Sequence, residues 1–348
     1  MLKLWLARMA SVAAVVIVTD FLAGWILLPR VETDIRTYHP YYHHGLLPSR
    51  SALTNWTRTN SYVLTTNSLG LRDSATRDVP LTSPRRRIVF VGDSFTEGVG
   101  VDFDKTFIGV LQRSPQGHDI DMFNAGVVSY SGMTDYLKIK YLTDVVGFRF
   151  DELVVFYDLS DPYNDYLLEF YEQFRPSRDA PPWWAAARRE ASSFMVRHST
   201  LFYNFNLIYN YERFGAFDRE FTRWTLDRDV FNRWAGKGLH VSMKYMQELV
   251  NLCRERHIRM AIAVYPWATL VENRDLHSLM VSVWSDFAAR NGIALINYFP
   301  DFINETPSAK VVQENFRPVD QHWTERGHAV IARRLLQFIQ HAPALVEP

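Results

Sequence analysis

A serine stands at the point where a buried strand is predicted to end. The stretch RRIVFVGDSFTEGVG, from Arg86 to Gly100, passes from an apolar run into Gly92, Asp93 and Ser94. The apolar run predicts a strand, and the small polar residues predict a sharp turn into a helix. Such a turn presents a side chain at the rim of a sheet, so Ser94 is a candidate nucleophile. In the alternative interpretation, Ser94 only caps the helix that follows.

A serine nucleophile needs a neighbouring base, and an imidazole has a suitable pKa at neutral pH. The stretch RPVDQHW places Asp320 and His322 just before the last predicted helix. We predict that His322 accepts the serine proton and that Asp320 orients the imidazole and stabilises its positive charge. His328 is the rival base, but it falls inside the final helix, where packing or capping is the more common role.

Acyl transfer also needs N–H donors for the oxyanion that develops on the carbonyl oxygen. In open α/β sheets, ligands bind beyond the carboxyl ends of the strands, so the residues that follow each strand are informative. Ser94 and Gly126 each come directly after a predicted strand. We therefore expect their backbone amides to be the oxyanion donors.

Three blocks of the sequence, in this order, resemble the SGNH (GDSL) hydrolase superfamily. They are Gly92-Asp93-Ser94-Phe95, Asn124-Ala125-Gly126 and DQHWTERGH. The resemblance covers Arg86 to the C-terminus apart from an insertion. It implies a three-layer α/β/α flavodoxin-like fold, serine-dependent hydrolysis or transfer of acyl groups through an acyl-Ser94 intermediate, and neither metal nor cofactor.

Further phrases, NSLGLRD, DLSDPYND and VYPW, are similar to membrane-anchored, extracytoplasmic SGNH-like proteins of bacteria. Some of those relatives add or remove O-acetyl groups on cell-surface polysaccharides. The resemblance therefore implies an acylated small molecule or polysaccharide as substrate, and allows for a membrane protein that delivers the acyl group. A catalytically weak protein that binds glycan or a membrane partner during surface polysaccharide assembly is the alternative.

The chain departs from the family pattern at two places. Many members carry Gly-x-Asn-Asp after the third strand, with the Asn side chain as an oxyanion donor, whereas this chain has Asp158-Leu159-Ser160-Asp161. Ser160 could donate a hydroxyl instead, or Asn164 could reach back. An acidic pair opposes an oxyanion unless it is hydrogen-bonded or directed away. The Asp-x-His spacing near the C-terminus is one residue shorter than the frequent Asp-x-x-His, a difference that a loop can absorb.

Alternating strand and helix patterns position these residues. Apolar runs predict five strands, which are RIVFVGD, DIDMFNAG, ELVVFYD, RMAIAVYP and IALINYF. Helical periodicity covers residues 105–113, 134–146, 239–256 and 276–291, and a last helix, TERGHAVIARRLLQFIQ, has Thr324 as a candidate N-cap. Strands that are apolar on both faces and separated by helices predict a mainly parallel five-stranded sheet between two helical layers.

The chain is expected to contain three parts, a membrane anchor (1–30), an irregular linker that packs on the domain (31–84) and the catalytic domain (85–348). Within the last, an aromatic-rich helical insertion spans about 161–234. We expect the insertion to form extra helices that pack an aromatic face on the core, and a cap or membrane-facing surface that shapes access to Ser94 is the alternative. Its tryptophans, Trp183, Trp184, Trp224 and Trp234, are expected in the core rather than as sugar-stacking platforms. In the linker, His39, His43 and His44 are expected to belong to an aromatic surface loop rather than to a metal site.

The N-terminal stretch MASVAAVVIVTDFLAGWILLP is apolar enough to span a hydrocarbon core of about 30 Å. Asp20 interrupts it, at a cost of about 2.5 to 3.5 kcal/mol near a helix centre. Lys3 and Arg8 precede the segment and Arg30 follows it, so the charge bias that sets orientation is weak. A cleaved signal peptide is the alternative. We expect a retained single-pass anchor with the catalytic domain outside the cytoplasm, in the periplasm.

Composition narrows the partners further. The 348 residues include 38 basic and 38 acidic side chains, so there is no net charge to favour nucleic acid. One cysteine, Cys253, excludes an intramolecular disulfide and a multi-thiolate metal site.

Overall fold

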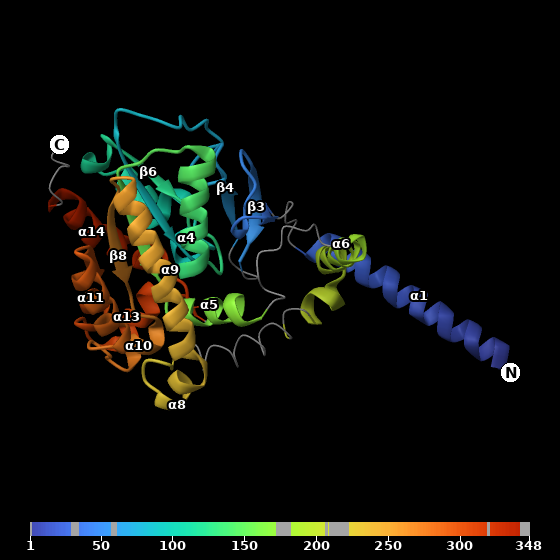
Figure 1. Ribbon diagram of the computed structural model, residues 1–348. Helices are drawn as coiled ribbons and strands as arrows, with labels where there is room; N and C mark the ends of the chain where they lie inside the picture. The colour runs from blue at the N-terminus through green and yellow to red at the C-terminus, as the bar shows by residue number, and fades with distance from the viewer. Residues whose placement is uncertain are drawn as a thin grey trace. The chain divides into compact units, whose positions relative to one another are not determined.

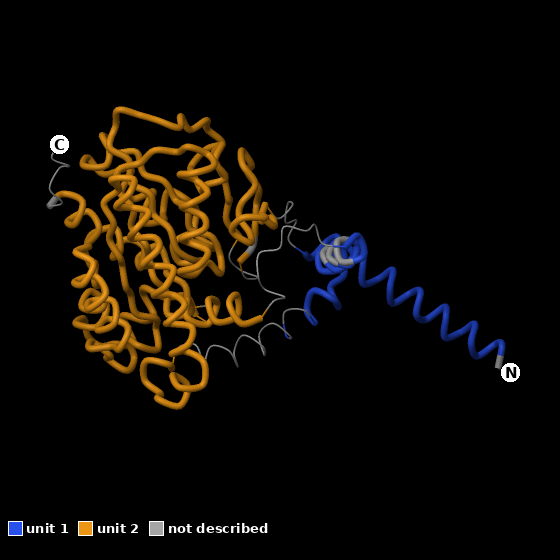
Figure 2. Tube along the Cα trace, in the orientation of Figure 1, with its two compact units in different colours: residues 1–32, 179–219 blue, residues 33–178, 220–348 orange. Residues whose placement is uncertain are grey.

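The computed structural model describes residues 2–28, 35–56, 61–171, 182–205, 208, 223–318 and 321–341. The chain divides into two compact units, which are coloured separately in Figure 2. The first comprises residues 1–32 and 179–219, and the second comprises residues 33–178 and 220–348. Each unit is described by itself below.

The second unit contains a five-stranded parallel sheet. Its spatial order is β6-β5-β7-β8-β9, so the first of these strands lies between the second and the third. Every neighbouring pair is parallel. The strands are β5 (Arg86–Gly92), β6 (Ile120–Asn124), β7 (Glu152–Tyr157), β8 (Arg259–Val264) and β9 (Ala294–Asn297). All five predicted strands and the parallel sheet are confirmed.

Helices cover both faces of the sheet (Figure 1). Successive residues of a strand point to opposite faces. On β7, the Phe156 ring packs 4.8 Å from that of Phe107 on one face. On the other face, Tyr157 packs 4.2 Å from Trp284, and its hydroxyl is 3.0 Å from Ser242 Oγ. These contacts define the three layers, with α3 (Phe107–Gln112) on one side and α9 (Gly236–Glu255) and α11 (Leu279–Asn291) on the other.

The remaining helices complete these layers and the loops at the sheet edge. They are α2 (Ser94–Glu97), α4 (Gly132–Lys140), α5 (Asp161–Phe170), α8 (Arg228–Val230), α10 (Ala268–Glu272), α12 (Phe299–Ile303), α13 (Ser308–Asn315) and α14 (Glu325–His341). The predicted N-cap of α14 is confirmed, because the Gly327 amide donates to Thr324 Oγ1 at 3.2 Å. Ile331 and Leu335, one turn apart on α14, are fully buried.

The described part of segment 31–84 is more regular than expected. It contains two antiparallel hairpins, β1 (Arg36–His39) with β2 (His43–Leu46), and β3 (Ser51–Asn55) with β4 (Ser61–Thr65). Tyr62 and Leu64 alternate with exposed neighbours along β4 and enter the core. This short alternation is a strand signal that the surrounding Tyr, His and Pro residues obscure.

The motif NSLGLRD joins this segment to the loop after Ser94 through hydrogen bonds. Asn67 Oδ1 accepts the amides of Leu69 and Leu71, which closes the turn on itself. Arg72 is fully buried, and its guanidinium donates to the carbonyl oxygens of Glu97, Gly98 and Val101. The arginine thus binds the C-terminal end of α2.

The tryptophans of the insertion fall into two groups. Trp224 and Trp234 are buried in the second unit, as expected. Trp183 and Trp184 begin α6 (Trp183–His198) in the first unit and are 81 % and 56 % exposed, so the expectation of a core position was wrong for this pair. The first unit also contains α1 (Leu2–Leu27), which is long and apolar enough to cross a membrane.

Replacement of Arg72 by methionine keeps much of the side-chain volume but removes the donors to three buried carbonyls. Because a buried acceptor without a partner costs about 1 to 3 kcal/mol, we expect Arg72→Met to lower the free energy of unfolding by about 3 kcal/mol or more. The control is Arg113→Met, since Arg113 is 56 % exposed and pairs with exposed Asp104. Such a pair contributes less than about 1 kcal/mol. Urea unfolding measures both variants, and equal losses would contradict this role of Arg72.

Candidate active site

A tight turn after β5 sets the position of Ser94. Gly92 has a φ of 152°, and a Cβ there would lie 2.6 Å from the Phe156 carbonyl oxygen and 2.6 Å from Thr96 Oγ1. Glycine is therefore required. Asp93 caps α2, because its Oδ1 accepts the Phe95 amide at 2.9 Å. Ser94 becomes the first residue of α2, at the carboxyl edge of the sheet.

His322 faces this serine from the opposite end of the sequence. Its Nε2 lies 2.8 Å from Ser94 Oγ. Two backbone contacts hold the chain at this histidine. The Arg317 amide donates to the His322 carbonyl oxygen at 2.8 Å, and Phe316 forms an isolated antiparallel β-bridge with Trp323. Phe95 packs against the imidazole at 4.6 Å between ring centroids. An unprotonated Nε2 is therefore placed to accept the hydroxyl proton of Ser94.

The predicted partner of this histidine, Asp320, lies outside the described residues, so its role stays a prediction. His322 itself lies in the short loop between α13 and α14, two residues after Asp320 in the chain.

The rival base, His328, is enclosed in the core. Its Nδ1 accepts the Phe107 amide at 3.3 Å, and its ring packs near Trp323. Burial, together with the positive charges of Arg72 and Arg317, lowers the pKa of His328 well below its ordinary value. A neutral imidazole that already accepts a backbone hydrogen bond is a structural group.

The backbone amide of Gly126 already donates a hydrogen bond within its own loop. It donates to Asn124 Oδ1 at 3.0 Å, and Asn124 Nδ2 in turn donates to the Thr96 carbonyl oxygen at 2.9 Å. A Cβ on Gly126 would lie 2.7 Å from Thr96 Cβ and 2.8 Å from the Glu97 nitrogen. Gly126 therefore packs directly on α2, the helix that Ser94 begins.

The segment Asp158–Asp161, where the chain departs from the family pattern, forms a turn that its own side chains close by hydrogen bonds. The Ser160 hydroxyl and amide both donate to Asp158 Oδ1, at 2.6 and 2.7 Å. Trp267 Nε1 donates to Asp158 Oδ2 at 2.7 Å, and the Asp158 amide donates to Asp161 Oδ2 at 3.0 Å. The hydroxyl of Ser160 is thus directed to a carboxylate of its own turn, and the carboxylate of Asp158 is hydrogen-bonded on both oxygens.

Buried carboxyl groups surround the back of the site. Burial and the neighbouring Asp158 raise the pKa of Asp93 and of Asp161 well above the ordinary range. Asp93 Oδ1 also accepts the Tyr265 hydroxyl at 3.3 Å, and its Oδ2 lies 3.2 Å from Ser94 Oγ. A raised pKa favours the neutral form of Asp93, and a neutral group beside the serine opposes an oxyanion less than a carboxylate does.

Two aromatic residues near the site were not identified from the sequence. Trp56, directly after β3, packs edge-on against the His322 ring at 5.0 Å. Trp267 packs 5.7 Å from Phe95 and holds Asp158. The phrase VYPW contains Trp267 and could have indicated it. No periodicity or motif distinguishes Trp56 in the sequence.

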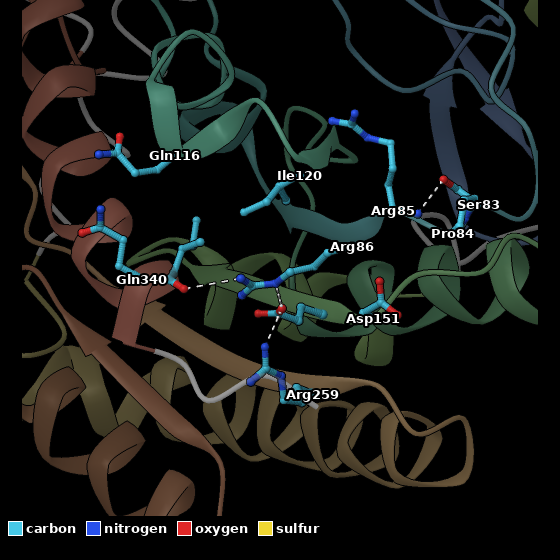
Figure 3. Close-up of a pocket in the computed structure, with 11 residues that line it drawn as sticks. Ser83, Pro84, Arg85, Arg86, Gln116, Ile120, Asp151, Arg259 and Gln340 are labelled. Carbon is cyan, nitrogen blue, oxygen red and sulfur yellow. Dashed lines mark hydrogen bonds and ion pairs between the residues drawn. The ribbon is translucent and has the colours of Figure 1, made fainter. Parts of the chain in front are cut away.

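A cavity of about 470 Å³ lies at the other edge of the sheet, where β5, β7 and β8 begin (Figure 3). Arg86 and Arg259 enter it and share the Glu152 carboxylate. Parallel strands place their amino ends opposite their carboxyl ends, so this cavity is separate from Ser94. Among the described residues, no group of three or more His, Cys, Asp or Glu side chains is arranged to hold a metal ion.

Several solved structures are similar to this chain. One is a member of the lipolytic protein G-D-S-L family from Veillonella parvula, at 14% identity over 74% of this chain and 99% of that chain, with a TM-score of 0.41. Another is an α/β hydrolase enzyme from the metagenome of Lake Arreo, at 15% identity over 76% and 99%, with a TM-score of 0.41. A third is an acetylxylan esterase from Geobacillus stearothermophilus, at 13% identity over 75% and 96%, with a TM-score of 0.42.

At these identities and TM-scores the likeness assigns neither a family nor an activity to this chain. No family model matches the chain, and no curated protein sequence matches it. The sheet order, the helices on both faces and the serine after the first parallel strand agree with the fold that the three motif blocks imply. The described part of the second unit forms a three-layer α/β/α fold.

The buried state of His328 has a measurable consequence. A neutral buried imidazole stabilises the fold above about pH 6.5, and this contribution is lost as the pH falls, because only the unfolded chain then binds the proton. Asparagine offers an acceptor and does not titrate. We expect the stability difference between wild type and His328→Asn to be largest near pH 7 and to shrink toward pH 5. Urea unfolding at each pH measures it, and a pH-independent difference would contradict the assignment.

Proposed function

We propose that this protein is a serine-dependent acyl-ester hydrolase or O-acyltransferase of the SGNH type. One observation carries the proposal, the 2.8 Å contact between Ser94 Oγ and His322 Nε2 at the carboxyl edge of a parallel sheet. The helix-capping alternative for Ser94 needs no such contact. Asp93 performs the capping, since its carboxylate accepts the Phe95 amide.

In this proposal, Ser94 Oγ forms a bond to the acyl carbon while its proton passes to His322 Nε2. The bond to the leaving alcohol then breaks, and the alcohol takes that proton. Water or another hydroxyl attacks acyl-Ser94 and gives its proton to His322, which returns it to Ser94 as the new acid or ester leaves. Asp320 is proposed to orient the imidazole.

The oxyanion is proposed to form at the start of α2. The first amides of a helix have no partner inside the helix, so the Ser94 amide is suited to the role. The Gly126 amide must be shared with, or released from, Asn124 Oδ1 in order to contribute. Ser160 is a weaker candidate, because its hydroxyl would first have to leave Asp158.

We further propose that the domain acts outside the cytoplasm on O-acetylated cell-surface carbohydrate, held to the membrane by α1. The length and apolar character of α1 support the anchor. The similarity of NSLGLRD and DLSDPYND to extracytoplasmic relatives supports the location and the substrate class. For transfer to a sugar, the proposed acyl donor is a membrane protein.

A second candidate function is binding of glycan without efficient turnover. The observation that favours it is the engagement of two expected oxyanion donors, Gly126 and Ser160, with side chains of their own loops. Glycan binding that survives Ser94→Ala, with no reaction of the wild type toward a serine-directed phosphonate, would favour this candidate over the enzyme.

The enzyme proposal predicts a reactive serine. We expect the full chain in detergent to be labelled by a fluorophosphonate and to release acetate from a small activated ester. Ser94→Ala and His322→Ala should each lose both reactions by at least about 100-fold, while the unfolding midpoint stays near that of wild type. Undiminished acetate release by Ser94→Ala would rule out the proposed nucleophile.

Trp56 is expected to position the base. An aromatic contact of this kind contributes about 0.5 to 1.5 kcal/mol, so Trp56→Ala should lower kcat/KM for a small ester about 3- to 10-fold, and Trp56→Phe should stay closer to wild type. Trp184→Ala, in the other unit, is the control. Unchanged kcat/KM in Trp56→Ala, with its unfolding midpoint also unchanged, would show that the contact has no such role.

A further inference from the structure

The acidic residue inside the apolar N-terminal helix has defined partners in the first unit. Asp20 Oδ1 accepts the Leu201 amide at 2.8 Å and the Thr200 hydroxyl at 2.5 Å. These donors begin the helical turn that follows α6. A carboxylate in an apolar helix is costly unless it is hydrogen-bonded. The contact therefore ties the insertion to α1 at the one acidic residue of that helix.

Two further contacts extend this junction along the same face of α1. A Cβ on Gly24 would lie 2.0 Å from the His198 carbonyl oxygen, so only glycine permits the approach. Phe21 packs against Phe194 of α6 at 6.1 Å between ring centroids. Residues 20, 21 and 24 recur at helical spacing, which places the end of α6 against one side of α1.

The junction lies close to one end of α1. Asp20 precedes the last residue, Leu27, by seven positions, and a helix rises 1.5 Å per residue, so the contact is about 10 Å from that end. Where the hydrocarbon core ends near Leu27, the contacts at Gly24 and Asp20 lie about 5 to 10 Å inside its boundary, which is the depth to which interfacial helices bury their apolar face.

The described part of the insertion exposes apolar side chains. Trp183 is 81 % exposed, and Phe194, Leu201 and Phe205 are each half or more exposed. Arg188 on the same helix is also exposed. Exposed tryptophans with phenylalanine, leucine and arginine are the composition of segments that lie in the membrane interface. Water is a poor solvent for this surface.

We propose that residues 183–205 form a second membrane-bound element, which lies beside α1 at the boundary between the headgroups and the acyl chains and uses lipid as its partner. The proposal rests on the membrane anchoring proposed for α1. Lipid is the proposed partner because the exposed apolar side chains of residues 183–205 surround a junction with α1, whose own surface is apolar and exposed. The chain would then be held at two adjoining places, and Asp20 joins them.

Site-specific labels can test this in the full chain. Burial raises the pKa of the Cys253 thiol to about 12, so the native cysteine is unreactive in the folded protein. Single cysteines are introduced as Leu201→Cys, Val15→Cys and Val145→Cys, and labelled with an environment-sensitive fluorophore. The variants are reconstituted in phosphatidylcholine vesicles that contain lipids with a quencher near the headgroup or deep in the acyl chain.

We expect the label at position 201 to be quenched most strongly by the shallow quencher and the label at 15 by the deep one. Val145 is exposed in the second unit, and its label should be affected by neither. Quenching at 15 but not at 201 would overturn the second element while leaving the anchor intact. Absence of quenching at both positions would overturn the anchor as well.

A variant with a larger side chain at position 24 tests whether the contacts between α1 and α6 hold residues 183–205 in place. Gly24→Leu inserts a side chain where His198 approaches and keeps α1 apolar, so quenching at position 201 should fall at least twofold while quenching at 15 is retained. Ala14→Leu, on the exposed surface of α1, is the matched control and should change neither. Equal quenching at 201 in wild type and Gly24→Leu would show that the junction does not hold this element.

Discussion

The turn between β5 and α2 leaves no space for a side chain at Gly92, and the candidate site is built on that turn. Its glycine lets the strand end against the Phe156 carbonyl, and Asp93 then starts the helix by accepting the Phe95 amide. Three other segments bind the same short helix. Gly126 packs on it, Arg72 binds its last carbonyls, and Glu97 forms an ion pair with Arg36.

Because several loops contact α2, segments far apart in the sequence are needed to position Ser94. The Glu97 carboxylate also accepts the Val128 amide at 2.9 Å, so the loops after β5 and β6 are joined beneath Ser94. His322 approaches from a fourth loop, held between α13 and α14. The carboxyl groups nearest the serine are buried, and burial with the neighbouring Asp158 raises the pKa of Asp93, which favours its neutral form. Position and charge thus favour a reactive hydroxyl.

Features that depend on local sequence could be predicted, and features that depend on distant contacts could not. Each apolar run had the length and flanking residues of a strand, so the sheet and the N-cap at Thr324 followed from pattern alone. Ser94 and His322 were chosen for their residue types beside predicted strand and helix ends, and the fold brings them together. Three contacts depend on tertiary packing and have no local signal in the sequence. They are the hydrogen bond of the Gly126 amide to Asn124, the edge-on contact of Trp56 with His322 and the hydrogen bonds to Asp20. The exposure of Trp183 and Trp184 was missed because composition alone does not separate core from interface.

The central claim is that the Ser94 hydroxyl becomes acylated. The most direct measurement mixes the protein with an activated acetyl ester, stops the reaction with acid within the first turnover, and determines the intact mass and the modified peptide by mass spectrometry. We expect one acetyl group, on the peptide that contains Ser94, which disappears as acetate is released. Turnover with no adduct on that peptide, or an adduct on another residue, would contradict it.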